Sequence, residues 1–155
     1  MYTIIPTSRF EKDIKYYIKK KKGRGGAVGK ADRQFSRFIR LRDALPGGAF
    51  KCISCGQFKP IEQADCGHFH SRTHMATRFS ELNAHAECRH CNRFSADHLT
   101  HYQSNLIAKI GQNQFDMLAV QAASVCKISE FELAEIAKLY KAKADKLSKE
   151  KGINI

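Results

Sequence analysis

The apolar residues of this chain recur at helical spacing in its two outer parts and lose that spacing between residues 50 and 92. An apolar stripe from Phe35 to Leu45 predicts a helix over residues 31–44, which Pro46 and two glycines end. Near the C-terminus, Ser129 and Glu132 form a capping-box pattern that begins a last helix. Helices are predicted at residues 9–22, 31–44, 97–110 and 114–125, and from residue 129 to the lysine-rich end.

The middle of the chain has the pattern of short strands joined by tight turns. Glycine, cysteine and histidine residues crowd together between residues 50 and 92. In a strand over residues 64–70, side chains alternate, which places Cys66, His68 and His70 on one face. We therefore expect an α+β fold in which a small strand-rich core is flanked by N- and C-terminal helices.

Four glycines between residues 23 and 29 are typical of a flexible linker. They follow a short β-rich run at residues 2–6 and the first predicted helix. The sequence therefore predicts three segments: a basic N-terminal strand–helix arm with its glycine-rich linker (residues 1–30), a central domain (31–125) and a C-terminal helix (126–155).

The chain has 155 residues and a net charge of +12, and the positive excess is N-terminal. Residues 1–51 contain 14 Lys and Arg against 4 Asp and Glu, while the rest of the chain is nearly balanced. A localised positive field attracts and orients a phosphate backbone, although a lysine-rich helix can also simply face solvent. The side chains predicted to contact DNA are Lys19, Lys20, Lys21, Lys22, Arg24, Lys30, Arg37, Arg40 and Arg42.

The six cysteines are better explained as metal ligands than as disulfides. No stretch approaches the roughly 18 consecutive apolar residues of a membrane span, and the N-terminus lacks a secretory signal pattern. We therefore expect a cytoplasmic protein with reduced thiols and no membrane partner. Two Cys-x-x-Cys pairs supply the thiolates of a closed tetrahedral Zn²⁺ site, which would stabilise the fold without taking part in catalysis. The predicted zinc ligands are Cys52, Cys55, Cys88 and Cys91.

Between the two cysteine pairs lie His68 and His70, flanked by Arg72 and Arg78. A lone histidine is more often a hydrogen-bonded structural residue, but two on one predicted face, flanked by arginines, favour a functional site.

Several motifs, in this order and at these spacings, resemble the NinG family of phage recombination proteins, which includes the lambda protein Rap. They are Phe35-Ser36-x-Phe38-Ile39-Arg40-Leu41-Arg42-Asp43, Cys52-Ile53-Ser54-Cys55-Gly56, Gly67-His68-Phe69, Arg78-Phe79-x-Glu81-Leu82-Asn83-Ala84-His85 and Cys88-x-x-Cys91-Asn92. The resemblance runs from about residue 31 to about residue 111. It implies a structure-specific DNA endonuclease that acts on Holliday junctions, D-loops or other branched DNA.

The order of cysteine pairs, histidine strand and asparagine is also similar to the zinc-stapled ββα-metal, or HNH, nucleases. That resemblance implies His68 as general base, Asn92 as a ligand of a catalytic Mg²⁺ or Mn²⁺, and Asn83 as a brace for the loop that orients the base. These roles suit hydrolysis of a phosphodiester, because a histidine can act as a base near neutral pH and oxygen ligands can hold Mg²⁺ against the scissile phosphate. Arg72 or Arg78 could bind a phosphate. HNH enzymes usually carry an aspartate ligand directly before the base, where this chain and the NinG pattern have Gly67. The second protein ligand therefore stays open between His70 and Asp65.

Two other functions remain as alternatives: a non-catalytic zinc module that binds DNA in recombination, and an HNH enzyme of the nicking or restriction type. The resemblance further implies branched or double-stranded DNA as the partner, other recombination proteins as further partners, and a phage or prophage origin with action in the bacterial cytoplasm. A junction-resolving enzyme must cut two opposed strands, which favours a homodimer.

Overall fold

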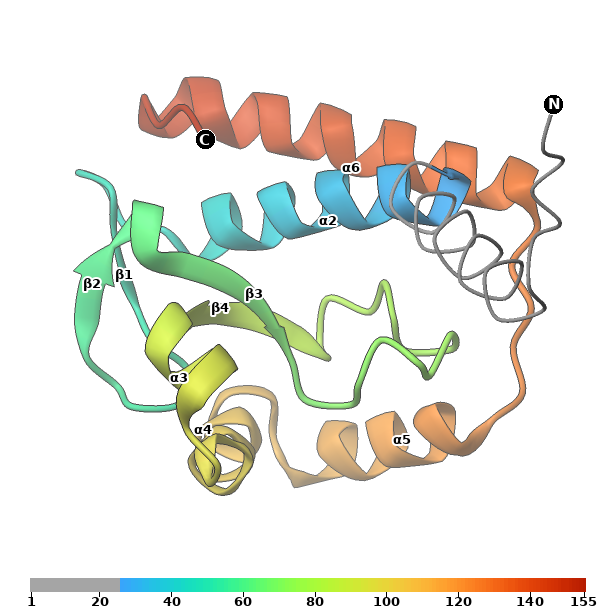
Figure 1. Ribbon diagram of the computed structural model, residues 1–155, viewed down its shortest axis with the longest axis horizontal. Helices are drawn as coiled ribbons and strands as arrows, with labels where there is room; N and C mark the ends of the chain where they lie inside the picture. The colour runs from blue at the N-terminus through green and yellow to red at the C-terminus, as the bar shows by residue number, and fades with distance from the viewer. Residues whose placement is uncertain (1–25) are drawn as a thin grey trace, which may run out of the picture.

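The computed structural model describes residues 26–155, in which helices and two small antiparallel sheets lie in layers (Figure 1). The α+β class is therefore confirmed. The strand predicted at residues 2–6 and the helix predicted at 9–22 lie outside the described residues. The elements are α2 (Ala27–Asp43), β1 (Ala49–Lys51), β2 (Phe58–Pro60), a 3-10 turn (Ile61–Gln63), β3 (Ala64–His68), β4 (Ala84–Cys88), α3 (Arg89–Phe94), α4 (His98–Ile110), α5 (Gln112–Ala123) and α6 (Glu130–Lys151).

Helix α2 begins at Ala27 and not at residue 31, so the linker prediction is wrong for residues 27–29. Three of the four glycines precede the helix, and only Gly29 lies inside it, where it is buried. One glycine in a helix costs about 1 kcal/mol relative to alanine, which burial of the apolar stripe from Phe35 onward outweighs. The stripe is shorter than predicted at its other end, because Leu45 lies beyond the helix and is 43% exposed.

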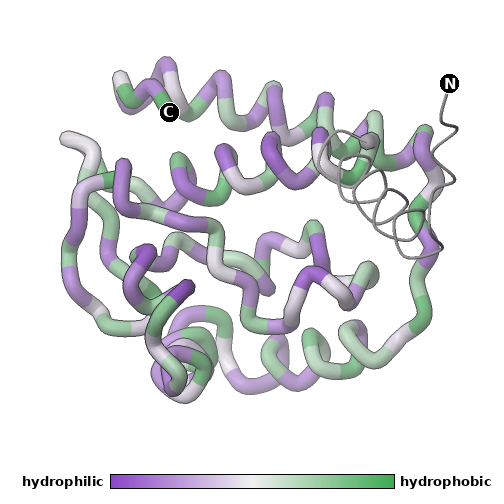
Figure 2. Tube along the Cα trace, in the orientation of Figure 1, coloured by the Kyte–Doolittle hydropathy of each residue, from purple (hydrophilic) through white to green (hydrophobic). Residues whose placement is uncertain are grey.

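Helix α6 lies alongside α2 and shares its core, so the C-terminal helix is not a separate unit of packing (Figure 1). Figure 2 shows hydrophobic and hydrophilic residues alternating along both helices. The Tyr140 ring contacts those of Phe35 and Phe38, with centroids 4.8 and 5.1 Å apart. Lys151 Nζ donates to the Leu41 carbonyl at 2.7 Å and to two further carbonyls at the end of α2, where a cation is favourable.

The capping box predicted at the start of α6 is confirmed. The Glu132 backbone N–H donates to Ser129 Oγ at 3.2 Å, and the Ser129 N–H donates to Glu132 Oε2 at 2.7 Å. These reciprocal bonds satisfy backbone donors that have no partner within the helix.

Strands β3 and β4 form an antiparallel pair below α2, and α3 follows β4 directly (Figure 1). Together they make a ββα unit, with Asp65 opposite Glu87 and Gly67 opposite His85. The other pair, β1 and β2, lies beside the first Cys-x-x-Cys turn. Each strand of a two-stranded sheet has one outer edge, and in the β3–β4 pair these two edges border two different clefts.

Helices α4 and α5 form a second, smaller core on the side of the hairpin away from α2 (Figure 1). Tyr102, Leu106 and Leu118 are its buried members, and the Tyr102 hydroxyl donates to the Gly67 carbonyl at 2.9 Å. That bond connects β3, the strand that carries the candidate base His68, to α4. Among residues 26–155, no helix is long and apolar enough to cross a membrane.

The α2–α6 packing predicts a large difference between two leucine truncations. Leu41 is fully buried in the main core, so Leu41→Ala should lower the free energy of unfolding by about 2–5 kcal/mol. Leu139 on α6 is 51% exposed, so Leu139→Ala should change it by no more than about 0.5 kcal/mol. Urea denaturation measures both, and equal losses would contradict this placement of the core.

Candidate functional site

Four cysteines meet at the base of the hairpin. The sulfur atoms of Cys52, Cys55, Cys88 and Cys91 all lie within 4.8 Å of one another. A tetrahedral zinc–thiolate site with bonds of about 2.3 Å places its sulfurs about 3.8 Å apart, so this cluster fits Zn²⁺ with little adjustment. The structure therefore brings together the four residues that the sequence predicted, as a group that could bind zinc.

The backbone around the cluster suits charged thiolates. The Cys88 N–H donates to Cys52 Sγ at 3.3 Å, which stabilises negative charge on that sulfur. Gly56 has a φ of +70°, a left-handed conformation that glycine adopts without strain and that closes the first turn. The remaining cysteines, Cys66 and Cys126, lie outside the cluster.

A cleft of about 400 Å³ at the outer edge of β3 brings together four of the predicted catalytic residues. Asp65 and His68 come from β3, Asn92 from α3, and Arg72 from the loop after β3. Its other lining residues are Ser36, Cys66 and Arg93. Burial raises the pKa of Cys66 to about 12, so the thiol beside His68 stays protonated at neutral pH.

The ring of His68 is held in one orientation by the loop opposite. Its Nε2 lies 3.0 Å from the Arg78 carbonyl, the shorter of the two contacts that the ring nitrogens make with carbonyl oxygens, so the proton of the neutral ring is assigned to Nε2. The Nδ1 atom lies 3.3 Å from the Cys66 carbonyl and keeps its lone pair in the neutral form. Burial lowers the pKa of His68, more than the bond to Arg78 raises it. At neutral pH this imidazole is therefore neutral and able to accept a proton at Nδ1.

Asp65 and Asn92 lie within bonding distance across the cleft. The Asn92 amide donates to Asp65 Oδ2 at 3.0 Å, which leaves the amide oxygen as a possible ligand. Arg93 donates to both carboxylate oxygens at 2.7 and 2.9 Å. Burial raises the pKa of Asp65, but the bonds from Arg93 and Asn92 outweigh it and hold the pKa below its usual range. A carboxylate and an amide oxygen fit Mg²⁺, which would replace Arg93 as the partner of Asp65.

A steric constraint explains why the residue before His68 is a glycine. A Cβ atom at Gly67 would overlap the carboxylate of Glu87, which is fully buried. Glu87 Oε1 accepts hydrogen bonds from Ser54 at 2.5 Å and from His98 at 2.8 Å. An aspartate at position 67 is thus excluded, and the carboxylate that faces the cleft comes from Asp65, two residues earlier on the same side of the strand.

His70 does not share the cleft with His68, so the predicted pairing of the two histidines is wrong. Strand β3 ends at His68, and alternation does not continue to residue 70. The His70 ring lies 5.0 Å from that of Phe69 and 6.0 Å from that of His74. The geometry therefore favours Asp65 over His70 as the second candidate ligand.

Asn83 is fully buried and braces the loop after β3. Its side-chain oxygen accepts the His70 N–H at 2.8 Å, and its amide donates to the carbonyls of His70 at 2.9 Å and Thr77 at 3.0 Å. This contact pattern agrees with the bracing role that the HNH resemblance implied.

The two candidate arginines differ in availability. Arg78 donates to both oxygens of Asp32 on α2, at 2.9 and 2.6 Å, and so holds the loop whose carbonyl orients His68. The Arg72 side chain is 61% exposed and lines both the β3-edge cleft and an adjoining cleft of about 740 Å³. Arg72 is therefore the better candidate for a phosphate contact, because both oxygens of Asp32 already hold Arg78.

Two of the basic residues predicted to contact DNA bind other parts of the protein instead. Arg37 forms an ion pair with Asp145 of α6, and Arg42 donates to Asp43 and to the Ala84 carbonyl. Arg40 is half-buried on α2, while Lys30 is exposed and stays a candidate. The remaining candidates, Lys19, Lys20, Lys21, Lys22 and Arg24, lie outside the described residues.

Sequence reasoning gave no role to Arg93 or to His85, although Arg93 lies next to a quoted motif and His85 lies within one. Arg93 directly follows Asn92 and pairs with Asp65. His85 closes the Asn83-Ala84-His85 motif and joins a buried network with Asp43 and Lys109. The adjacency to Asn92 was a usable signal for Arg93, whereas the partners of His85 are distant in sequence.

Comparisons with known proteins found one matching family and several related sequences. Residues 8–150 match the family model described as bacteriophage lambda NinG protein, a longer span than residues 31–111 predicted from the motifs. The proteins named ninG from Escherichia phage lambda and Escherichia phage 933W are each 39% identical over 93 residues. These matches cover 57% of this chain and 42% of each relative, so the chain spans less than half the length of the curated relatives it matches. No solved structure matches the chain.

The cysteine cluster predicts opposite results for two cysteine substitutions. Cys88→Ser should lose bound zinc and much of its thermal stability, because the energy of zinc binding is also folding energy. Cys126→Ser, outside the cluster, should keep both. Metal analysis and thermal melting test this, and a zinc-free Cys88→Ser protein with unchanged melting would refute the structural zinc site.

Proposed function

This chain belongs to the bacteriophage lambda NinG family, and from that premise we propose that it is a metal-dependent endonuclease for branched recombination DNA, such as Holliday junctions and D-loops. The observation that carries the proposal is the convergence of Asp65, His68 and Asn92 on one open cleft next to the cysteine cluster. The order of hairpin and helix around that cleft supports an HNH-type core for the same region.

His68 acts as the general base in this proposal. Hydrolysis of a phosphodiester needs a group that accepts the proton of the attacking water. His68 Nδ1 can do so because Nε2 already donates to the Arg78 carbonyl. The Cys66 carbonyl, 3.3 Å from Nδ1, can then accept a hydrogen bond from the new N–H group.

Asp65 and Asn92 are the residues that would hold the catalytic cation. Bound Mg²⁺ or Mn²⁺ would stabilise the charge of the scissile phosphate and of the leaving 3′-oxygen. Arg72, exposed at the mouth of the cleft, binds and orients a phosphate of the substrate. By the HNH resemblance, the products carry 5′-phosphate and 3′-hydroxyl ends.

A non-catalytic DNA-binding zinc module is the second candidate, and one observation favours it. Arg93 already occupies both oxygens of Asp65, so the cleft as it stands holds an internal ion pair in the place of a cation. Such a module would recruit other recombination proteins to DNA, and it would leave the orientation of His68 without a function. A homodimer, which would place two clefts on opposed strands, belongs to the nuclease proposal.

Cleavage of a labelled four-way junction in Mg²⁺ or Mn²⁺ tests the proposal, with a linear duplex of the same sequence beside it. Metal-dependent cuts near the branch would support the junction nuclease. Tight binding without cleavage would support the DNA-binding module, and equal cutting of both substrates would support a nicking or restriction-type HNH enzyme.

Replacement of the proposed base should remove catalysis alone. We expect His68→Ala to lower cleavage by roughly 10²-fold or more, while junction affinity and zinc content stay near those of the unmodified protein. His101→Ala on α4 is the matched control, because His101 is exposed and is not one of the residues that line the β3-edge cleft. A His68→Ala protein with more than about a tenth of the original activity would contradict the assigned role.

The assignment of Asp65 as a cation ligand can be tested by metal affinity, without measuring cleavage. Asp65→Asn should weaken Mn²⁺ binding by about 10-fold or more, because a neutral amide replaces the only carboxylate that lines this cleft among the described residues. Asp116→Asn on α5 removes an exposed carboxylate and should change nothing. Calorimetric titration with Mn²⁺ decides, and equal affinities of both variants would exclude Asp65 as a ligand.

A further inference from the structure

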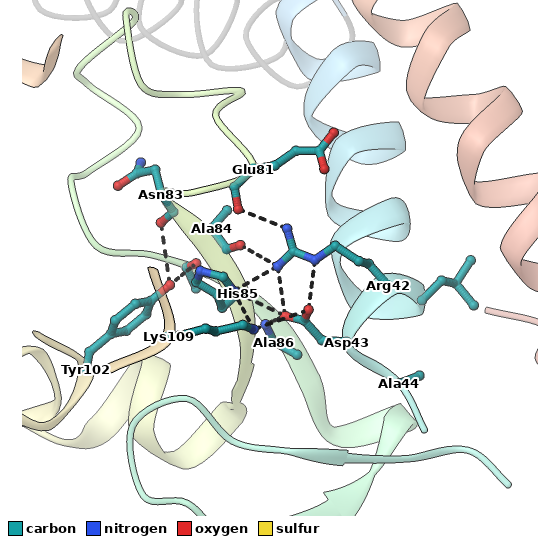
Figure 3. A network of polar contacts seen from close by, with 12 residues as sticks. Arg42, Asp43, Ala44, Glu81, Asn83, Ala84, His85, Ala86, Tyr102 and Lys109 are labelled. Atoms are coloured by element: carbon teal, nitrogen blue, oxygen red, sulfur yellow. Dashed lines mark hydrogen bonds and ion pairs between the residues drawn. The ribbon is translucent and has the colours of Figure 1, made fainter. Parts of the chain in front are cut away.

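A second cleft, of about 430 Å³, lies at the outer edge of β4, on the other side of the hairpin from the β3-edge cleft. The end of α2, the first cysteine turn and α4 form its walls. Figure 3 shows four of its lining residues, Asp43, His85, Ala86 and Lys109. The polar side chains that line it belong to Asp43, Lys51, His85, Asn105 and Lys109. We call it the β4-edge cleft.

His85 presents an unused hydrogen-bond donor at this cleft. Its Nδ1 lies 2.8 Å from Arg42 Nη2 and 3.0 Å from Lys109 Nζ, both cationic donors, while the nearest Asp43 oxygen is 3.5 Å away (Figure 3). Nδ1 therefore accepts, and the ring proton is on Nε2. Burial lowers the pKa of His85, so the ring is neutral. Only 2% of His85 is exposed, and its Nε2 has no partner among the described residues.

The charge around this donor is positive. Lys51 is exposed and has no ion-pair partner among the described residues. Lys109 Nζ lies 3.6 Å from Asp43 Oδ1, and the Lys109 side chain is 46% exposed. The carboxylate of Asp43 accepts from Arg42 at 2.8 and 3.0 Å and from the Ala86 N–H at 2.8 Å, so it is largely neutralised. The Asn105 amide donates to the Ile53 carbonyl and is not free to donate to a ligand.

An unpartnered N–H group on a residue that lines the cleft, together with two lysines of the same lining, suits an anion with several acceptor oxygens. We propose that the β4-edge cleft binds a phosphate group through His85, Lys51 and Lys109, and that this group is a backbone phosphate of DNA. The choice of DNA as its source rests on the proposed function. Inorganic phosphate shares the chemistry and is separated from DNA by the experiment.

The position of the cleft gives this phosphate site a role. Asp65 and His68 border the outer edge of β3, and His85 and Ala86 border the outer edge of β4. Neighbouring strands lie only about 4.8 Å apart, so the two clefts open on opposite sides of a narrow hairpin. DNA bound at both edges must therefore present backbone on both sides of the hairpin, as the two strands that flank a groove do, or two arms at a branch.

A double variant tests the site by binding alone. Lys51→Ala with Lys109→Met should lower four-way junction affinity by about 10-fold and flatten the log–log salt dependence by about one unit, the effect of one lost phosphate contact. The matched control is Lys138→Ala with Lys146→Ala, two exposed α6 lysines, which removes the same charge. Binding is measured without divalent metal in a His68→Ala background. The result can therefore be interpreted even if the protein proves not to be a nuclease.

Nuclear magnetic resonance of the His85 ring in the otherwise unmodified protein avoids any folding defect of the variants. The Nε2 resonance should shift when inorganic phosphate is added and when junction DNA is added. A shift with DNA, with or without one from phosphate, supports the proposal. A shift with phosphate alone would overturn the DNA assignment, and no shift with either, or equal losses in the two double variants, would overturn the site itself.

Discussion

The closeness of four cysteine sulfurs, all within 4.8 Å of one another, is the constraint on which both clefts depend. The cluster ties the turn after β1 to the junction of β4 and α3. Asn92 directly follows the last of these cysteines, so its amide is fixed at 3.0 Å from Asp65. Cys52 also lines the β4-edge cleft. A zinc ion bound to these thiolates would turn their proximity into a stable link, because metal binding is coupled to folding.

Charged residues of α2 orient the two histidines from above the hairpin. Asp32 holds Arg78, whose carbonyl accepts from His68 Nε2. At the other end of the helix, Arg42 and Asp43 bond to the backbone of β4 around His85. Burying such ion pairs contributes little net stability, but losing one partner leaves an uncompensated charge, so these pairs fix geometry. The charged residues of α2 thus hold other parts of the protein in place, in addition to any role in binding DNA.

The two clefts differ in a way that matches their proposed roles. At the β3 edge, the ionised Asp65 carboxylate and a neutral His68 give oxygen ligands and a base. At the β4 edge, the one lining carboxylate is already paired and the remaining groups are donors or cations. Gly67 lies between them, where the buried Glu87 carboxylate excludes a side chain. A cation site on one edge and an anion site on the other would let a single hairpin hold DNA while cutting it.

Sequence alone determined the elements whose signals are local: the helix stripe from Phe35, the capping box at Ser129 and the two cysteine pairs. Each depends on residues a few positions apart, or on the spacing that a shared metal ion requires of its cysteine ligands. The expectation that His68 and Asn92 share a site came from the family resemblance, and both line the β3-edge cleft. Tertiary structure decided the rest. Arg37 is paired with a residue 108 positions away and Arg78 with one 46 positions away, so nothing in their neighbourhood marked them as structural. His70 left the predicted face because β3 ends where Asn83, from beyond the loop, takes over its backbone bonds, and no local period records such a distant partner.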